Sequence, residues 1–153
     1  MMLDLASRFW KVIPPWLRSF LTRRLHTTVT ASAAGIIFNE EGKVLLLDHL
    51  LRPASGWGVP GGFLDKGEQG EDALRRELKE EVGLEISDVR LYRVRTLKRH
   101  IEIVFVARAK GEPSVQSREI RDARWFSLED MPGEMSLTQQ FMIKAAADAE
   151  TTA

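Results

Sequence analysis

A glycine-containing loop runs directly into a carboxylate-rich helical pattern between Gly62 and Leu84, in the stretch GFLDKGEQGEDALRRELKEEVGL. Within it, Glu77, Glu80 and Glu81 stand at relative positions 0, 3 and 4. At about 100° per residue, these carboxylates fall within an arc of roughly 100° on one helix face. Like charges at this spacing repel by roughly a few tenths of a kcal/mol per pair, so a bound cation would stabilise them. Mg²⁺ is the natural candidate, because it prefers oxygen ligands and binds together with phosphates.

The same helix carries an apolar stripe beside its carboxylates. Leu74, Leu78 and Val82 recur every four residues and predict a helix over roughly 70–82 that is anchored to a core. Gly83 suits the position that follows a helix, where the backbone turns left-handed. One face is therefore expected to fix the helix and the adjacent face to present carboxylates.

The flanking sequence predicts strands that alternate with helices. Buried apolar runs and apolar–charged alternation indicate strands over 29–38, 43–50, 86–98, 101–109 and 122–126, with a loop at 52–62. A closing helix is expected over 137–149, and we assign its core face to Phe141, Ile143, Ala145 and Ala146, with Met142 at the margin of that face. Together these elements predict an α/β fold, an α/β/α sandwich around a mixed β-sheet.

Composition excludes several classes of protein. The 153 residues suit one domain with a single core, and the formal net charge of zero provides no global attraction for nucleic acid. With no cysteine, disulfides and thiolate metal sites are excluded, and we predict a cytoplasmic protein. No apolar run reaches the length of a transmembrane helix, and charged and proline residues interrupt any signal peptide at the N-terminus.

Residues 1–28 differ from the rest of the chain. They carry a net charge of +4, and from Pro15 onward apolar residues such as Trp16 and Phe20 recur at helical spacing, which predicts an amphipathic helical extension. A membrane surface is one possible partner of such a helix. The more ordinary interpretation is packing against the following domain or a second subunit, which makes a homodimer possible.

The fixed positions of the central stretch resemble the Nudix box. Gly62 is followed after five residues by Glu68, and after seven more by Arg76-Glu77-Leu78-x-Glu80-Glu81-x-Gly83-Leu84. The resemblance extends from about residue 29 to about 142, so we assign 29–150 to a Nudix hydrolase domain. It implies the sandwich fold and metal-dependent hydrolysis of a nucleoside diphosphate linked to another group. Mg²⁺ is the implied cofactor, with Mn²⁺ as a possible substitute.

The resemblance also implies roles for individual residues. Glu77 and Glu81 are the first expected metal ligands, followed by Glu80, directly or through water, and by the carbonyl of Gly61. Glu68 and Arg76 are expected to pair and tie the loop to the helix, because an arginine fork binds a carboxylate with specific geometry. The general base of such enzymes comes from the box or from a carboxylate outside it. Outside the box we favour Glu119, with Glu102 as runner-up, although the strand position of Glu102 suggests that it faces solvent. Candidate substrate contacts are Trp57, Arg52 and Arg99.

Markers of particular substrates are mostly missing. The proline of ADP-ribose-type members, the tyrosine of dinucleoside-polyphosphate members and the coenzyme A signature are all absent at the expected places. Nucleoside di- and triphosphates and nucleoside diphosphates linked to alcohols or sugars remain, and we expect a small-molecule nucleotide rather than nucleic acid. A non-catalytic module that binds nucleotide or RNA and an RNA-decapping enzyme are the alternatives.

Overall fold

Two antiparallel strands, β1 (Thr30–Phe38) and β2 (Val44–His49), form the centre of the sheet in this computed structural model. The structure describes residues 13–17, 19–20, 28–52 and 55–152. The chain divides into two units, Met1–Thr30 and Ala31–Ala153. In the first unit, residues 15–17 and 19–20 are helical, and most of the predicted extension lies outside the described residues.

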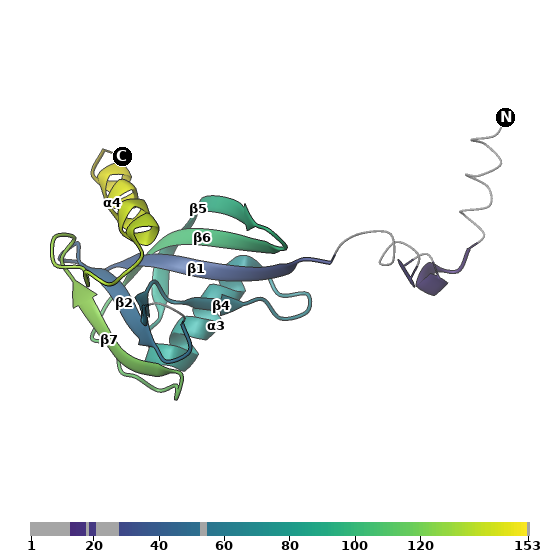
Figure 1. Cartoon of the computed structure of the whole chain (residues 1–153), viewed down its shortest axis with the longest axis horizontal. Coiled ribbons are helices and arrows are strands. Elements are labelled where there is room, and N and C mark those ends of the chain that lie inside the picture. The colour runs from purple at the N-terminus through teal and green to yellow at the C-terminus, as the bar shows by residue number, and fades with distance from the viewer. Residues whose placement is uncertain (1–12, 18, 21–27, 53–54, 153) are drawn as a thin grey trace. The chain divides into compact units, whose positions relative to one another are not determined.

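Five further strands complete the sheet (Figure 1). They are β3 (Trp57–Gly58), β4 (Gly61–Phe63), β5 (Ile86–Leu97), β6 (His100–Ala109) and β7 (Ile120–Phe126). The main order is β3-β2-β1-β6-β5, while β4 pairs with β1 and β7 with β2. The β5–β6 hairpin, expected from alternating residues, is antiparallel.

Helix α3 (Gly70–Val82) and helix α4 (Leu137–Thr152) cover opposite faces of this sheet. Because side chains alternate along a strand, Leu45 and Leu47 of β2 pack in the core that includes α3. The intervening Leu46 packs with Ile143 of α4 in the second core. The predicted α/β/α sandwich around a mixed sheet is confirmed. Among the described residues, every helix is too short or too polar to span a membrane.

Two expectations about local structure were wrong. Residues 52–62 are not wholly loop, since β3 and β4 pair with β2 and β1. Their two or three residues are mostly glycine and carry no alternating pattern that would indicate a strand. On α4 the core face consists of Met142, Ile143 and Ala146, whereas Phe141 is 71% exposed and Ala145 is also exposed. The prediction is therefore right for Ile143 and Ala146 and wrong for Phe141 and Ala145, and Met142, placed at the margin, belongs fully to the buried face.

Candidate active site

Helix α3 is fixed by its apolar stripe, which leaves its carboxylates beside β4. Leu74, Leu78 and Val82 are almost completely buried, as predicted. The helix ends at Gly83, whose φ of 69° is left-handed and whose N–H donates to the Lys79 carbonyl at 3.1 Å. Glu81 is the buried charged residue of this face, with 8% exposure. The predicted division into an apolar and a carboxylate face is therefore confirmed.

Two consecutive glycines allow the sheet to approach the carboxylates closely. At Gly61, φ is 146°, and a Cβ atom would collide with the backbone of Ala33 and Ala34 on β1. At Gly62, a Cβ atom would overlap the carboxylate of Glu77. Glycine is therefore required here for two different contacts, one with the neighbouring strand and one with the helix.

Arg76 connects the loop to the helix through its planar guanidinium group. Its Nε donates to Oε1 of Glu68 at 2.9 Å, and one terminal nitrogen donates to Oε2 at 2.9 Å, which confirms the predicted pair. The other terminal nitrogen donates to Oε1 of Glu77 at 2.8 Å. The hydrogen bonds from Arg76 lower the pKa of Glu68 to about 2, so this carboxylate stays ionised.

The Glu81 carboxylate lies in an unusual electrostatic environment. Burial, together with the nearby charge of Glu77, raises the pKa of Glu81 to about 8, although Arg52 and a backbone hydrogen bond from Gly61 act in the opposite direction. Its Oε2 atom is buried and has no hydrogen-bond partner within residues 28–52 and 55–152. A buried carboxylate oxygen without a partner is costly in free energy unless another group satisfies it.

Sequence reasoning missed His49, which faces this carboxylate from the end of β2. Its Nδ1 lies 4.0 Å from Oε1 of Glu81, and its side chain is 12% exposed. Burial, and to a lesser extent the charge of Arg52, lowers the pKa of His49 to about 4, so the imidazole is neutral near pH 7. The only signal in the sequence is a histidine at the end of a buried apolar strand, two residues beyond Leu47 on the same strand face.

A pocket of about 190 Å³ adjoins the box on the α4 side of β4. Its charged lining residues are Arg52 and Glu102, and Gln139 contributes an amide from α4. Arg52 donates to the Val59 carbonyl at 2.9 Å, and its charge interacts with both Glu81 and Glu102. The expectation that Glu102 faces solvent was wrong, because it pairs with Arg95 across the β5–β6 hairpin and is only 16% exposed.

The other two candidate substrate contacts are not among the residues that line this pocket. Trp57 stacks edge-on against Phe126, with ring centroids 5.1 Å apart, and belongs to the core under α4. Arg99 lies in the tight turn between β5 and β6. Of the three residues, the structure brings only Arg52 into the pocket beside the box.

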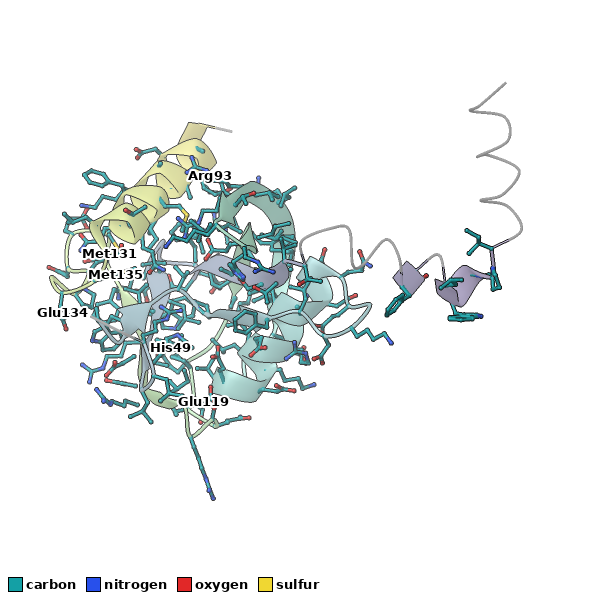
Figure 2. All side chains as sticks on the ribbon, turned by 45° about the vertical axis from the view of Figure 1, so that its right-hand side comes forward. His49, Arg93, Glu119, Met131, Glu134 and Met135 are labelled. Atoms are coloured by element: carbon teal, nitrogen blue, oxygen red, sulfur yellow. The ribbon has the colours of Figure 1, made fainter. Side chains whose placement is uncertain are left out.

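Glu119 lies close enough to Glu81 for their charges to interact. It immediately precedes β7, and its carbonyl accepts a hydrogen bond from the Leu50 N–H at 2.8 Å. This contact joins it to the same strand end that carries His49, and Figure 2 labels both residues on one side of the domain. The side chain of Glu119 is exposed and belongs to the rim of the site.

The residues present match the chemistry of a hard divalent cation. Glu77 and Glu81 offer carboxylate oxygens. One of these oxygens, Oε2 of Glu81, is buried without a partner among the described residues. Glu80 is 63% exposed and lies 3.6 Å from Arg76. Within the described residues, no three His, Cys, Asp or Glu side chains already form a metal-binding group. Arg76 occupies an oxygen of Glu77, so a cation would compete with this guanidinium for that ligand.

Curated relatives match much of the chain. An ADP-ribose pyrophosphatase from Methanocaldococcus jannaschii is 33% identical over 116 residues, which cover 71% of this chain and 68% of the relative. A protein named NAD-capped RNA hydrolase NudC from Pseudomonas putida is 33% identical over 105 residues, or 66% of this chain. The match spans only 38% of that hydrolase, so the chain corresponds to less than half of its length.

Solved structures show the same fold. A MutT NUDIX hydrolase from Burkholderia pseudomallei has a TM-score of 0.67 and 26% identity, over 77% of this chain and 98% of the other. A NUDIX family hydrolase from Clostridium perfringens has a TM-score of 0.69 and 23% identity, over 80% and 99% of the two chains. The family model of the NUDIX domain matches residues 28–146. The chain therefore belongs to the Nudix family.

Proposed function

We propose that this chain is a Mg²⁺-dependent hydrolase that cleaves the phosphoanhydride bond of a nucleoside diphosphate derivative or of a nucleoside di- or triphosphate. The observation that carries the proposal is Glu81, a buried carboxylate with an unpartnered oxygen beside Glu77 and the Gly61–Gly62 strand. A purely binding module has no need for a buried carboxylate, which burial disfavours, beside a second carboxylate of the same helix.

The division of labour follows from the contacts. Glu77 and Glu81 would hold the cation, with Glu80 contributing directly or through water and the Gly61 carbonyl as a further ligand. A bound Mg²⁺ supplies neutralisation of phosphoryl oxygens and acidification of water. Arg76 holds Glu77 in place and ties it to Glu68, which makes both positioning residues. A fixed ligand geometry matters because small displacements of reacting groups lower the rate strongly.

The remaining polar groups would handle substrate and protons. Arg52 is half-buried, lines the pocket and carries a positive charge that interacts with Glu81, so it would attract the diphosphate of a substrate. Glu119 stands at the rim near Glu81 and is our candidate for the base that takes a proton from the attacking water. We retain Trp57 and Arg99 as more distant candidate contacts with the substrate.

The names of two relatives support the substrate class. ADP-ribose and the NAD cap of RNA both contain a nucleoside diphosphate joined to a second sugar. The diphosphate of such a substrate would bind at the cation, and its nucleoside would lie in the pocket beside the box. We therefore include both compound types in the substrate class, beside nucleotides with a small second group or none.

A substrate panel tests the proposal. Nucleoside di- and triphosphates, ADP-ribose, NAD, nucleoside diphosphate sugars and alcohols, and a short NAD-capped RNA are incubated with enzyme and Mg²⁺, and phosphate release is measured with added phosphatase where needed. We expect turnover of at least one compound that EDTA abolishes. Failure to hydrolyse any of them, or unchanged turnover in EDTA, would overturn the proposal.

For the extension, we propose that residues 29–150 carry the activity and that residues 1–28 pack on this domain or on a second copy of the chain. Deletion of residues 1–26 tests this, by measurement of oligomer mass, thermal stability and vesicle binding. Packing on the domain lowers stability at unchanged mass, and packing on a second copy lowers the mass. Loss of vesicle binding with neither change would contradict the proposal.

A further inference from the structure

Two neighbouring side chains at the candidate site each bury a polar atom that has no hydrogen-bond partner among the residues that the structure describes. These atoms are Nε2 of His49 and Oε2 of Glu81. The other nitrogen of the imidazole, Nδ1, lies 4.0 Å from the other carboxylate oxygen, Oε1. This separation exceeds the length of a hydrogen bond by about 1 Å, so the two side chains must move closer before they can form one. Buried polar groups are rarely left in this state unless strain, a catalytic role or a bound water or ion accounts for them.

The backbone directs His49 toward Glu81. Along β2, Leu45 and Leu47 face the core that includes α3, and His49 is the next residue on that side. The pairing of β2 with β7 shifts register between Asp48 and His49, as in a bulge. The N–H of His49 donates to the Gly56 carbonyl at 2.8 Å, which anchors the strand end. The extra residue of this bulge, Arg121, lies on β7, so β2 keeps its regular alternation as far as His49.

The cationic side chains around Glu81 already donate elsewhere. Arg52 donates to the carbonyl of Val59. Arg76 donates to Glu68 and Glu77. The imidazole of His49, by contrast, turns Nδ1 toward Glu81, and this nitrogen lies 4.0 Å from Oε1. It is therefore well placed to orient the Glu81 carboxylate.

We infer that His49 is a positioning residue, whose Nδ1–H donates to Oε1 of Glu81 and leaves Oε2 free to bind the divalent cation. The inference rests on the proposed function, because it needs Glu81 to be a metal ligand. Residues that hydrogen-bond a metal-ligating carboxylate fix its orientation, and their loss typically weakens metal binding about 10- to 100-fold. His49 itself would contact neither the cation nor the substrate.

Mn²⁺ binding to the full chain tests the inference without any substrate. Free Mn²⁺ is followed by electron paramagnetic resonance as the metal is titrated into wild type and three variants. His49→Leu removes the donor at similar size, His49→Asn keeps an N–H donor near the position of Nδ1, and Glu81→Gln removes the proposed ligand. Thermal melts verify folding, and His49→Val replaces the leucine variant if that variant does not fold.

We expect His49→Leu to weaken Mn²⁺ binding about 10- to 100-fold and His49→Asn to remain within about threefold of wild type. If Glu81→Gln loses binding while His49→Leu binds as wild type does, the role of His49 is overturned and the metal site stands. Equal losses of Mn²⁺ affinity in the leucine and asparagine variants would show that the shape of the side chain matters and not its N–H donor. That result also overturns the role of His49. If Glu81→Gln binds Mn²⁺ like wild type, the metal site of the proposed function fails, and the role of His49 fails with it.

Discussion

Arg76 holds Glu68 with two parallel hydrogen bonds of 2.9 Å and reaches Glu77 with a third of 2.8 Å. One side chain thus connects the loop after β4 to the proposed metal ligand. A lysine at this position keeps the charge but offers no planar fork, so it satisfies one of these partners at a time.

We therefore expect Arg76→Lys to lower kcat about 10- to 100-fold through displacement of Glu77. Steady-state kinetics on the preferred substrate measure this effect. Arg75→Lys is the matched control, because Arg75 pairs with Glu71 on the exposed side of the same helix. Equal activity of the two variants would show that the fork of Arg76 has no part in positioning.

Substitution of alanine for each of the two glycines of β4 is expected to affect a different property of the protein. At Gly62, an added methyl group meets only the carboxylate end of the Glu77 side chain, which can shift away, so Gly62→Ala should change the free energy of unfolding by less than about 1 kcal/mol yet weaken Mn²⁺ binding. At Gly61, the methyl group meets backbone and φ is 146°, so Gly61→Ala should destabilise by about 1–3 kcal/mol. Urea unfolding and metal titration separate the two effects. A stable Gly61→Ala protein, or a Gly62→Ala protein with normal metal affinity, would contradict this account.

The pKa of Glu81 predicts a pH dependence of stability in metal-free protein. Its pKa is raised from 4.5 to about 8, so the folded state binds this proton more tightly and stability falls as pH rises between these values. The pKa of His49 is lowered from 6.5 to about 4, so the folded state binds this proton less tightly. Its effect is that stability rises as pH rises from about 4 to 6.5. Between pH 6.5 and 8 only the effect of Glu81 remains.

As the pH rises from 6.5 to 8, the free energy of unfolding in EDTA should fall by about 1–2 kcal/mol. Glu81→Gln should abolish the slope, whereas Glu71→Gln, on the exposed part of the same helix, should retain it. Excess Mg²⁺ should reduce the slope in wild type, because the cation stabilises the ionised carboxylate. Urea unfolding at several pH values measures all three. A slope that survives in Glu81→Gln would assign the titration to another group.

The orientation of α4 gives a prediction about stability alone. Ile143 is completely buried, so Ile143→Ala should cost about 2–5 kcal/mol of unfolding free energy. Phe141 is largely exposed, so Phe141→Ser should change it by less than about 0.5 kcal/mol. Chemical denaturation of the two variants decides between the observed face and the one expected from sequence. A large loss of unfolding free energy in Phe141→Ser would favour the face expected from sequence.

Strong periodicity explains which elements were predictable. Helix α3 was placed correctly because Leu74, Leu78 and Val82 repeat without ambiguity and Gly83 ends the pattern. The pair of Glu68 with Arg76 followed from the resemblance to the Nudix box, in which both positions are fixed. On α4, alanines and Met142 give several nearly equivalent apolar faces, so tertiary packing rather than pattern decided the orientation.

The missed features depend on contacts between distant parts of the chain. His49 and Glu81 are far apart in sequence, and only the packing of β2 against α3 brings them together. The strands β3 and β4 consist mostly of glycine, and their pairing partners, not their own residues, make them extended. Glu102 looked solvent-facing by alternation, but Arg95 holds it across the hairpin.

The most direct test of the central claim is the Mg²⁺-dependent turnover of the preferred substrate by Glu81→Gln, with Glu71→Gln as control on the same helix. The account predicts that Glu81→Gln keeps its fold and loses at least about a hundredfold in kcat, while Glu71→Gln stays close to wild type. Wild-type turnover by Glu81→Gln at every Mg²⁺ concentration would show that this buried carboxylate holds no catalytic cation.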